Sequence, residues 1–523
     1  MAHPGIALVA GPGEGGYGTA LRMRKDCPLG HRRIEAAAPG CAETGARRKG
    51  VRRRVAVLLA SALAMSGCGT LGSLRQTFLG GQSRSGGSQR LTGFIGAAVA
   101  DEPRAALAAR EVLALGGSAA DAAVALGFTL AVTLPSRAGL GSGGACLAYN
   151  PSADGPGQGS PEAIMFTPAA PSAVLPNTDR PAAVPMLARG LFALHARYGK
   201  QSFESLVAPA EQLARFGVPV SRALLHDLEL VAGPLAADPN ARAVFAPGGA
   251  VLEQGGTLLQ NDLGGTLAQI RTAGVGDLYQ GALARRLEEA SRVAGGRLAL
   301  ADLRAALPRT TAPLVLRAGR DSAAFLPPPA DGGLGAAVAF QALEARPGDL
   351  AGAQARAFGA VAQWRRGGGD PQGVLATAPA SGSLPSLPAS TGFAVLDRNG
   401  NSVACSVTMN NLFGTGRIAP GTGILLAASP RAATPPLLSA VIAWNANVRG
   451  FRAAVTGSGQ EGAALAVAVG LTNALRGNAA MPAPVPEPGR ANAIACARYL
   501  PGEEVSCDAA VDSRSIGLAV GSN

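Results

Sequence analysis

Apolar residues recur with helical spacing over much of the first two thirds of the chain. Asp101 is suited to cap a helix that runs to about Leu115, where Gly116-Gly117 end it. Ser118 is suited to cap the next helix, ADAAVALGFTLAV, which is apolar on nearly all sides and therefore expected inside a large core. Further helices are predicted over VPMLARGLFALHARYG and over residues 204–216, 264–274, 281–294 and 300–306.

Patterns that favour β-strands gather late in the chain. Strand-like runs span 393–396, 402–409 and 440–448. Before the first of them lies GGGDPQGVLATAPASGSLPSLPA, residues 367–389, which is rich in helix and strand breakers and has no period. A segment of this length without structure inside a compact body is typically functional or cleaved. A strand begins directly after it with Ser390-Thr391.

The N-terminal part has the pattern of an export signal. Residues 48–68, RKGVRRRVAVLLASALAMSGC, combine a basic cluster, an apolar run too short to cross a bilayer, and small residues before Cys68. We predict an unstructured or over-extended start at 1–50, a lipoprotein signal peptide at 51–68, and a Gly/Ser-rich tether at 69–92. Cys68 would then be the lipidated first residue of a protein held on the periplasmic side of a bacterial envelope. Plain secretion, and a buried apolar segment with an incidental cysteine, are the alternatives.

Charge and histidine content exclude other classes of function. Residues 1–67 carry 11 basic and 4 acidic residues, a net of +7, which leaves +5 of the total +12 for the rest of the chain. A body so close to neutrality has no evident stripe for phosphate groups, so no nucleic-acid partner is expected. Four histidines and no CxxC pair argue against a metal site.

Four cysteines remain in the body. Cys146 and Cys405 stand in apolar contexts and are predicted to be core residues. Cys496 and Cys507 flank a segment with a Pro-Gly turn, and we predict a disulfide between them in an oxidising compartment.

Three glycine-rich or polar segments are candidates for chemistry. Gly139 to Gly144 fits GxGxxG, but a helix precedes it and a strand follows it, which favours a close-packed loop over a dinucleotide site. The run 402–426 places polar residues between apolar strands, as either a turn or a substrate cradle. Gly457 to Gly462 leads into a helix, where main-chain N–H groups can bind an anion or an oxyanion, or simply begin the helix.

The order of these segments resembles the gamma-glutamyltransferase family of N-terminal-nucleophile hydrolases. The resemblance rests on LALGGSAADAAVALGFTLAVTLPSRAGLGSGGACL, GVGDLYQG, LPPPADGGLG and STGFAVLDRNGNSVACSVTMNNLFGTG, and extends from about Ala98 to about Gly521. It implies an α+β fold, a four-layer αββα sandwich, made as one precursor that cuts itself. Residues 93–366 would correspond to the large subunit and 390–523 to the small one, the two remaining associated after cleavage.

The resemblance also assigns the catalytic residues. It places the nucleophile on Ser390, where the family has threonine, and a second hydroxyl on Thr391, which is the fallback nucleophile. Thr408 matches a supporting threonine. A freed α-amino group has a pKa near 7.7 to 8, so it can accept the hydroxyl proton without a histidine or a cofactor.

The substrate-binding positions agree only in part. Asn410 matches a substrate-contacting asparagine, Ser439 is one of a serine pair that has become Leu438-Ser439, and Gln460-Glu461 replace two glycines of the oxyanion loop. The arginine that grips the glutamyl carboxylate is replaced by Thr167, and the aspartate that binds the amino group by Ala432.

These departures leave three hypotheses. The first is an exported amide hydrolase or acyltransferase with a Ser or Thr nucleophile, acting on a small amide or peptide whose acyl group differs from glutamate. The second is a true gamma-glutamyl enzyme with a substitute anchor such as Arg137 or Arg431. The third is a catalytically inactive envelope lipoprotein that retains the sandwich.

Overall fold

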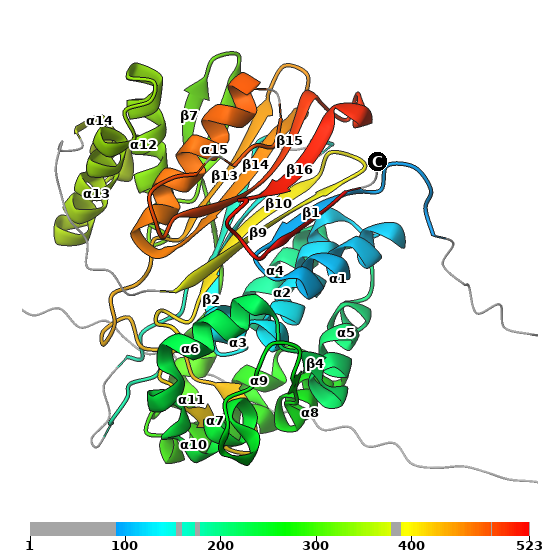
Figure 1. The fold of residues 1–523 in the computed structure, drawn as a ribbon, viewed down its shortest axis with the longest axis vertical. Helices are drawn as coiled ribbons and strands as arrows, with labels where there is room; N and C mark the ends of the chain where they lie inside the picture. The colour runs from blue at the N-terminus through cyan, green and yellow to red at the C-terminus, as the bar shows by residue number, and fades with distance from the viewer. Residues whose placement is uncertain are drawn as a thin grey trace, which may run out of the picture. The chain divides into compact units, whose positions relative to one another are not determined.

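Two antiparallel β-sheets face each other, and helices cover the outer side of each, so that four αββα layers result (Figure 1). The computed structural model describes residues 90–152, 159–172, 178–377, 389–477, 479–482 and 484–521. The expected signal segment, Cys68 and the tether up to residue 89 lie outside the described residues. The predicted α+β class and its layers are confirmed.

The first sheet has seven strands in the order β17-β1-β9-β10-β2-β3-β6. β9 pairs with β1 on one side and with β10 on the other, both antiparallel. The chain after the expected linker thus enters the interior of this sheet rather than an edge. The strands are β1 (Gly96–Ala100), β2 (Gly143–Tyr149), β3 (Glu162–Phe166), β6 (Arg309–Thr311), β9 (Ser390–Asp397), β10 (Ser402–Thr408) and β17 (Leu518–Gly521).

The second sheet has six strands in the order β16-β15-β14-β13-β8-β7. They are β7 (Leu314–Ala318), β8 (Asp321–Phe325), β13 (Ser439–Asn445), β14 (Gly450–Ser458), β15 (Arg490–Leu500) and β16 (Cys507–Val511). Two short pairs complete the strands of the described chain: β4 (Val218–Pro219) with β5 (Thr257–Leu258), and β11 (Ile418–Ala419) with β12 (Ile424–Leu425).

Helices α1, α2 and α4 pack on the first sheet, and α12 and α15 on the second, with α13 against α12 (Figure 1). On the first sheet's side the helices are α1 (Pro103–Ala114), α2 (Ala119–Thr133), α3 (Pro135–Ala138), α4 (Leu187–Tyr198), α5 (Phe203–Phe216), α6 (Arg222–Ala236), α7 (Pro239–Phe245), α8 (Asn261–Ala273), α9 (Asp277–Gln280), α10 (Ala282–Val293) and α11 (Leu300–Ala305). On the second sheet's side they are α12 (Gly332–Ala345), α13 (Leu350–Gly367), α14 (Pro371–Thr377) and α15 (Ala463–Gly477).

The predicted helices are present with ends within a few residues of those expected, but one cap differs. Ser118 caps α2 through a capping box with Asp121, as its position predicted. The residue that caps α1 is Glu102, whose carboxylate accepts a hydrogen bond of 2.9 Å from the Ala105 N–H. The prediction that Asp101 caps this helix was wrong, and its carboxylate is free to bind elsewhere.

The alternation of side chains along β9 determines which way its first residues face. Ala394 and Leu396 belong to the core between the sheets, whereas Phe393 and Val395 belong to the core beneath α1 and α2. Successive side chains of a strand point to opposite faces. Ser390 therefore faces the space between the sheets.

Two disulfides join neighbouring antiparallel strands. Cys496 and Cys507 are bonded between β15 and β16, which confirms the predicted pair. Cys146 and Cys405 are fully buried, as expected, but they too are bonded to each other, between β2 and β10. This second pair is 259 residues apart in sequence, so its register was not visible before the sheet was known.

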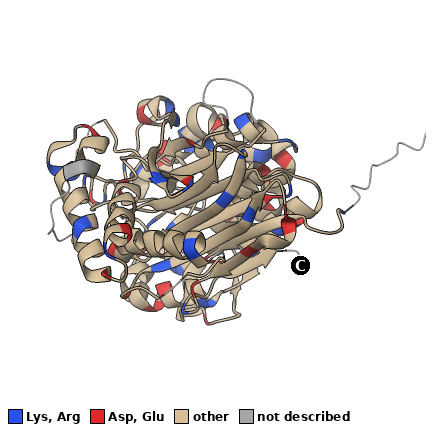
Figure 2. Ribbon diagram, turned by 90° about the horizontal axis from the view of Figure 1, so that it is seen from above, with Lys and Arg blue, Asp and Glu red and all other residues tan. Residues whose placement is uncertain are grey.

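Charged residues lie mostly on helices and in the segments that connect the elements, with acidic and basic residues interspersed (Figure 2). The strands carry few charges, as expected where both faces of a sheet are covered. No helix in the described part of the chain is long and apolar enough to cross a membrane.

Candidate active site

Ser390 presents a buried hydroxyl to which no other described residue makes a hydrogen bond. Its side chain is 1% exposed, and its Oγ is unpartnered among the described residues. A buried hydroxyl normally finds a partner, because leaving it unpaired costs about 1–3 kcal/mol. Its position at the start of an interior strand, facing the second sheet, makes it a candidate for a reacting group rather than a structural one.

Thr408 lies opposite Ser390 and contacts the peptide bond that precedes it. The two residues are paired in the register of β9 and β10. Thr408 Oγ1 donates a hydrogen bond of 2.7 Å to the carbonyl oxygen of Ala389 and accepts one of 2.7 Å from the Asn410 N–H. Because the Asn410 N–H donates to the Thr408 oxygen, the single proton of the Thr408 hydroxyl remains available for the Ala389 carbonyl. A carbonyl held in this way is polarised, and a negative charge developing on its oxygen would be stabilised.

Thr391 has a partner of its own. Its Oγ1 donates a hydrogen bond of 2.8 Å to Oδ2 of Asp101, which lies directly after β1. By the strand alternation its side chain leaves β9 on the face opposite to that of Ser390. Of the two adjacent hydroxyls, that of Ser390 is the uncommitted one.

Asn410 connects the end of β10 to the segment that follows β12. Its side chain is 2% exposed, and its Nδ2 donates a hydrogen bond of 2.8 Å to the carbonyl of Ala428. Its backbone has a φ of 63°, a left-handed conformation that asparagine tolerates better than most residues. Asn410 thus stands one residue beyond Met409 and next to the Thr408 hydroxyl, close to the Ala389–Ser390 bond.

The glycine loop after β14 begins beside β9. A Cβ atom at Gly392 would lie 2.8 Å from the Cβ and Oγ1 of Thr456 in the second sheet, so the sheets can approach here only because residue 392 is glycine. Gln460 and Glu461 lie four and five residues beyond Thr456, in a short 3₁₀ helix immediately before α15. Oε2 of Glu461 is buried without a partner among the described residues.

Ser439 lies on a different face. Val441 and Ala443 of the same strand, β13, belong to the core beneath α12 and α15, and the alternation places Ser439 with them. Consistent with this, a Cβ atom at Gly332, the first residue of α12, would lie 2.4 Å from Ser439 Oγ. The Ser439 hydroxyl donates to the carbonyl of Leu437. The structure therefore brings Ser390, Thr408 and Asn410 together and directs Ser439 away from them.

Arg137 lies in α3, which contacts both β9 and β10. Its guanidinium is bonded to Asp227 through Nε and Nη2, at 2.8 and 2.6 Å, and no described residue accepts a hydrogen bond from its Nη1. Burial opposes the charged form of Arg137, but the charge and hydrogen bonds of Asp227, with a contribution from Asp101, raise its pKa. A cation with an uncommitted donor thus stands beside the strands that carry Ser390 and Thr408.

The other residues at the expected anchor positions are more open. Thr167, directly after β3, is partly exposed, and Ala432 is exposed. Arg431 is exposed as well, and its Nη1 makes a long contact of 3.5 Å with the carbonyl of Ser172.

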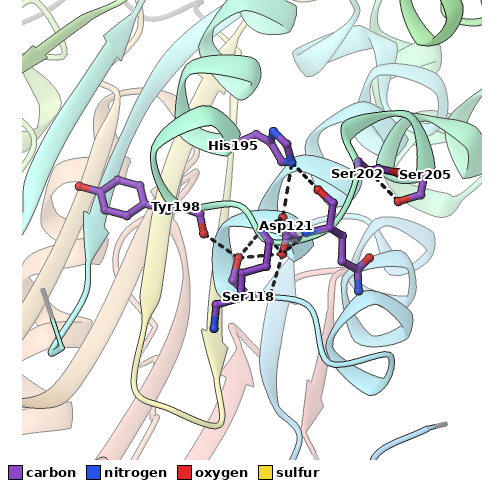
Figure 3. Close-up of polar contacts among 8 residues, drawn as sticks. Ser118, Asp121, His195, Tyr198, Ser202 and Ser205 are labelled. Carbon is purple, nitrogen blue, oxygen red and sulfur yellow. Dashed lines mark hydrogen bonds and ion pairs between the residues drawn. The ribbon is translucent and has the colours of Figure 1, made fainter. Parts of the chain in front are cut away.

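A second group of residues has the composition of a catalytic triad but not its geometry. Ser118, Asp121 and His195 lie near the end of β9 opposite to Ser390, where the Ala119 N–H donates to Asp397, and Ser118 lines a cavity of about 270 Å³. The Ser118 hydroxyl lies within hydrogen-bond distance of two acceptors, the Asp121 carboxylate at 2.9 Å and the Tyr198 carbonyl at 3.0 Å. His195 Nε2 contacts the Gln201 carbonyl at 2.7 Å and Asp121 at 3.8 Å (Figure 3). Since no bond joins the imidazole to the serine, this network caps α2 and fixes the loop after α4; it does not activate a nucleophile.

Comparison with known proteins points to one family. The sequence model of the gamma-glutamyltranspeptidase family matches residues 105–366, half of the chain. The glutathione hydrolase proenzyme of Escherichia coli is 27% identical over 380 residues, 60% of this chain and 63% of that protein. The acylase ACY 1 proenzyme of a Pseudomonas species is 32% identical over 230 residues, 40% of this chain and 41% of that protein. The chain thus spans less than two thirds of the length of either relative.

Among solved structures, cephalosporin acylase from Bacillus halodurans superimposes with a TM-score of 0.67 over 84% of this chain and 98% of that one, at 18% sequence identity. At this level of identity the likeness concerns the fold.

Proposed function

Because the chain belongs to the gamma-glutamyltranspeptidase family, we propose that it is a self-cleaving hydrolase or acyltransferase of amide bonds with Ser390 as its N-terminal nucleophile. The observation that carries the proposal is a Ser390 hydroxyl with no partner among the described residues, next to an Ala389 carbonyl that accepts a hydrogen bond from Thr408. Ser390, the first residue of β9, then supplies the nucleophile, and Ala389, which precedes it, supplies the electrophilic carbonyl. Thr408, at the end of the neighbouring β10, supplies the donor for the developing oxyanion.

Self-cleavage would proceed in two steps. The Ser390 Oγ attacks the carbonyl carbon of Ala389, the C–N bond breaks, and the hydroxyl proton passes to the departing Ser390 nitrogen, leaving an ester. Water then opens the ester and yields a carboxylate at Ala389 and a free amine and hydroxyl on Ser390. Thr408 stabilises the oxyanion in both steps through its hydrogen bond.

The freed α-amino group completes the catalytic apparatus. Its ordinary pKa of about 7.7 to 8 lets it accept the Ser390 hydroxyl proton near neutral pH and return it to the leaving amine. Ser390 then forms an acyl ester with an amide substrate, and water or an amine releases the acyl group. This scheme needs no histidine, metal or cofactor.

We further propose that the acyl group differs from glutamate. The positions at which the family binds the two charged ends of a glutamyl group hold Thr167 and Ala432, neither of which supplies a charge. Bonds to charged groups contribute more than neutral ones, so their absence selects against a glutamyl substrate. The second candidate is a gamma-glutamyl enzyme that uses the free donor of Arg137 for the carboxylate.

The protein is proposed to act outside the cytoplasm, anchored through a lipid on Cys68. The basic-apolar-cysteine pattern of residues 48–68 supports export, and so do the two disulfides, because disulfides persist in oxidising compartments.

The test is incubation of the purified full chain at neutral pH, with N-terminal sequencing and intact mass of the products. Wild-type protein should yield a fragment that begins at Ser390; Ser390→Ala should stay whole, and Ser390→Thr should still cleave. Ser406→Ala is the matched control, because Ser406 is also a buried serine without a partner among the described residues and pairs with Gly392 in the same sheet. A wild-type chain that stays whole contradicts the proposal.

A further inference from the structure

Asp101 is a buried carboxylate whose hydrogen bonds reach strands of both sheets. It is 6% exposed and lies directly after β1. Oδ2 accepts hydrogen bonds from Thr391 Oγ1 at 2.8 Å and from the Gly392 N–H at 3.3 Å. Oδ1 accepts one of 2.8 Å from Nδ2 of Asn492 in β15 of the second sheet. Every one of these donors lies outside α1, the helix that Asp101 precedes.

Asn492 holds the same residue, Gly392, from the other sheet. Its Nδ2 also donates a hydrogen bond of 2.9 Å to the carbonyl of Gly392. The N–H of Gly392 is thus held by Asp101 and its C=O by Asn492. Both residues are nearly fully buried, at 6% and 1% exposure.

This arrangement replaces a missing part of the sheet. The ladder between β1 and β9 ends at the pair Ala100–Phe393, so the first three residues of β9 have no β1 partner. On the other side, β10 continues as far as the Thr408–Ser390 pair. Gly392, two residues after Ser390, has no main-chain acceptor from β1. The carboxylate of Asp101, the residue directly after β1, accepts its N–H instead.

We propose that Asp101, Thr391 and Asn492 form a positioning network that holds Ser390 in its reactive geometry, before and after cleavage. The inference rests on the proposed role of Ser390 as nucleophile and adds residues that do not touch the reacting atoms. Cleavage would turn Ser390 into a chain terminus, and termini fray unless they are tied down. A clamp on the next two residues keeps its hydroxyl and amine directed at the reacting carbonyl, and a displacement of about 1 Å costs about a hundredfold in rate.

Thr391 gives the sharpest test, because valine has nearly its shape without its hydroxyl, and serine keeps the hydroxyl. The full chain is incubated at neutral pH, and the first-order rate at which the Ser390 fragment appears is measured together with the thermal midpoint of unfolding. Thr391→Val and Asp101→Asn should slow cleavage by about tenfold to a hundredfold well below their midpoints. Thr391→Ser should restore the rate to within a few fold of wild type, which a purely structural role of the methyl group would not predict.

Thr129→Val is the matched control. Thr129 is a fully buried threonine whose hydroxyl donates within its own helix, to the carbonyl of Ala125. This variant should cleave like wild type even where its midpoint falls. If Asp101→Asn does not fold, the comparison of valine and serine at Thr391 still decides the question.

The outcomes separate this inference from the function on which it rests. A wild-type chain that stays whole overturns both. If the wild type cleaves at Ser390 and Thr391→Val cleaves at the same rate, the positioning network alone is overturned. A new N-terminus at Thr391 shows that residue to be the nucleophile itself and overturns its positioning role.

Discussion

The hydroxyl of Thr408 is bonded to the carbonyl oxygen of Ala389 at 2.7 Å, on the peptide bond that the neighbouring Ser390 would cleave. We predict that Thr408→Val slows self-cleavage by about a hundredfold or more, the usual loss when one donor to an oxyanion is removed. Thr408→Ser, which keeps the donor, should cleave much faster than the valine variant. The rate of fragment formation on a reducing gel measures both, and equal rates for valine and wild type would contradict the role assigned to Thr408.

The Cys146–Cys405 disulfide joins β2 to β10, and therefore joins the two fragments that cleavage after Ala389 would produce. We predict that cleaved protein runs as one species on a denaturing gel without reductant and as two with it. The double variant Cys146→Ser/Cys405→Ser should run as two fragments in both conditions.

Cys496→Ser/Cys507→Ser is the control for this experiment, because both cysteines lie in the second fragment. It should behave like wild type on both gels. Cleaved wild-type protein that separates without reductant would show that the Cys146–Cys405 bond does not form in solution.

Much of the fold could be predicted from local patterns. The cap of α2, the glycine pair after α1 and the apolar periodicity fixed the helices near the N-terminus. The first strand, β1, could not be predicted in the same way. β1, GAAVA, is buried on both faces, and such a strand is a short apolar run that periodicity does not distinguish from a piece of helix.

The residues of the candidate site that lie close together in sequence could be predicted, and those whose positions depend on distant segments could not. Ser390 and Thr408 lie on two adjacent strands and Asn410 lies two residues after the second, so a resemblance over that short segment was enough to place them together. Asp101 was missed as a partner of Thr391 because the two are 290 residues apart, and because an acidic residue before a helix fits a cap equally well. The face on which Ser439 lies depends on the register of β13 within the second sheet, which no local pattern contained.

Glu102 should make stability depend on pH. Its Oε2 accepts hydrogen bonds from the Ala105 N–H and the Thr133 hydroxyl, but burial is the larger effect and raises its pKa above the ordinary value. The folded state then binds the proton more tightly than the unfolded state. The bound proton therefore stabilises the folded state of the wild type below the ordinary pKa of glutamate. This stabilisation is lost as the pH rises through the folded-state pKa of Glu102.

Glu102→Gln stays neutral at every pH and can place its Oε1 at the position of the Glu102 Oε2. Measured by urea unfolding, the stability of this variant relative to wild type should increase as the pH rises from about 4 to about 7. Glu204→Gln, a change at an exposed glutamate in the first turn of α5, corrects for the loss of a negative charge. A trend in the opposite direction would show that hydrogen bonding outweighs burial at Glu102.

Cys68→Ser should release the protein from the membrane fraction. An acyl chain contributes about 0.8 kcal/mol of membrane affinity per buried CH₂, and the serine variant lacks the thiol that would carry it. Fractionation, with the mass of the N-terminal peptide, measures the effect. Unchanged fractionation without an attached lipid would exclude Cys68 as the anchor.

Restoring the two charges at the anchor positions should change substrate preference. In Thr167→Arg/Ala432→Asp, arginine would supply a bidentate partner for the glutamyl carboxylate and aspartate one for its amino group. Both positions reach solvent, so neither new charge would be buried without a partner. Because a hydrogen bond to a charged group contributes about 1.5–3 kcal/mol, turnover of a gamma-glutamyl anilide should rise by about tenfold or more.

Thr167→Lys/Ala432→Asp is the control, since lysine brings the charge without the planar pair of donors and should gain less. A double variant that cleaves itself but gains no gamma-glutamyl activity would show that Thr167 and Ala432 do not face the acyl group.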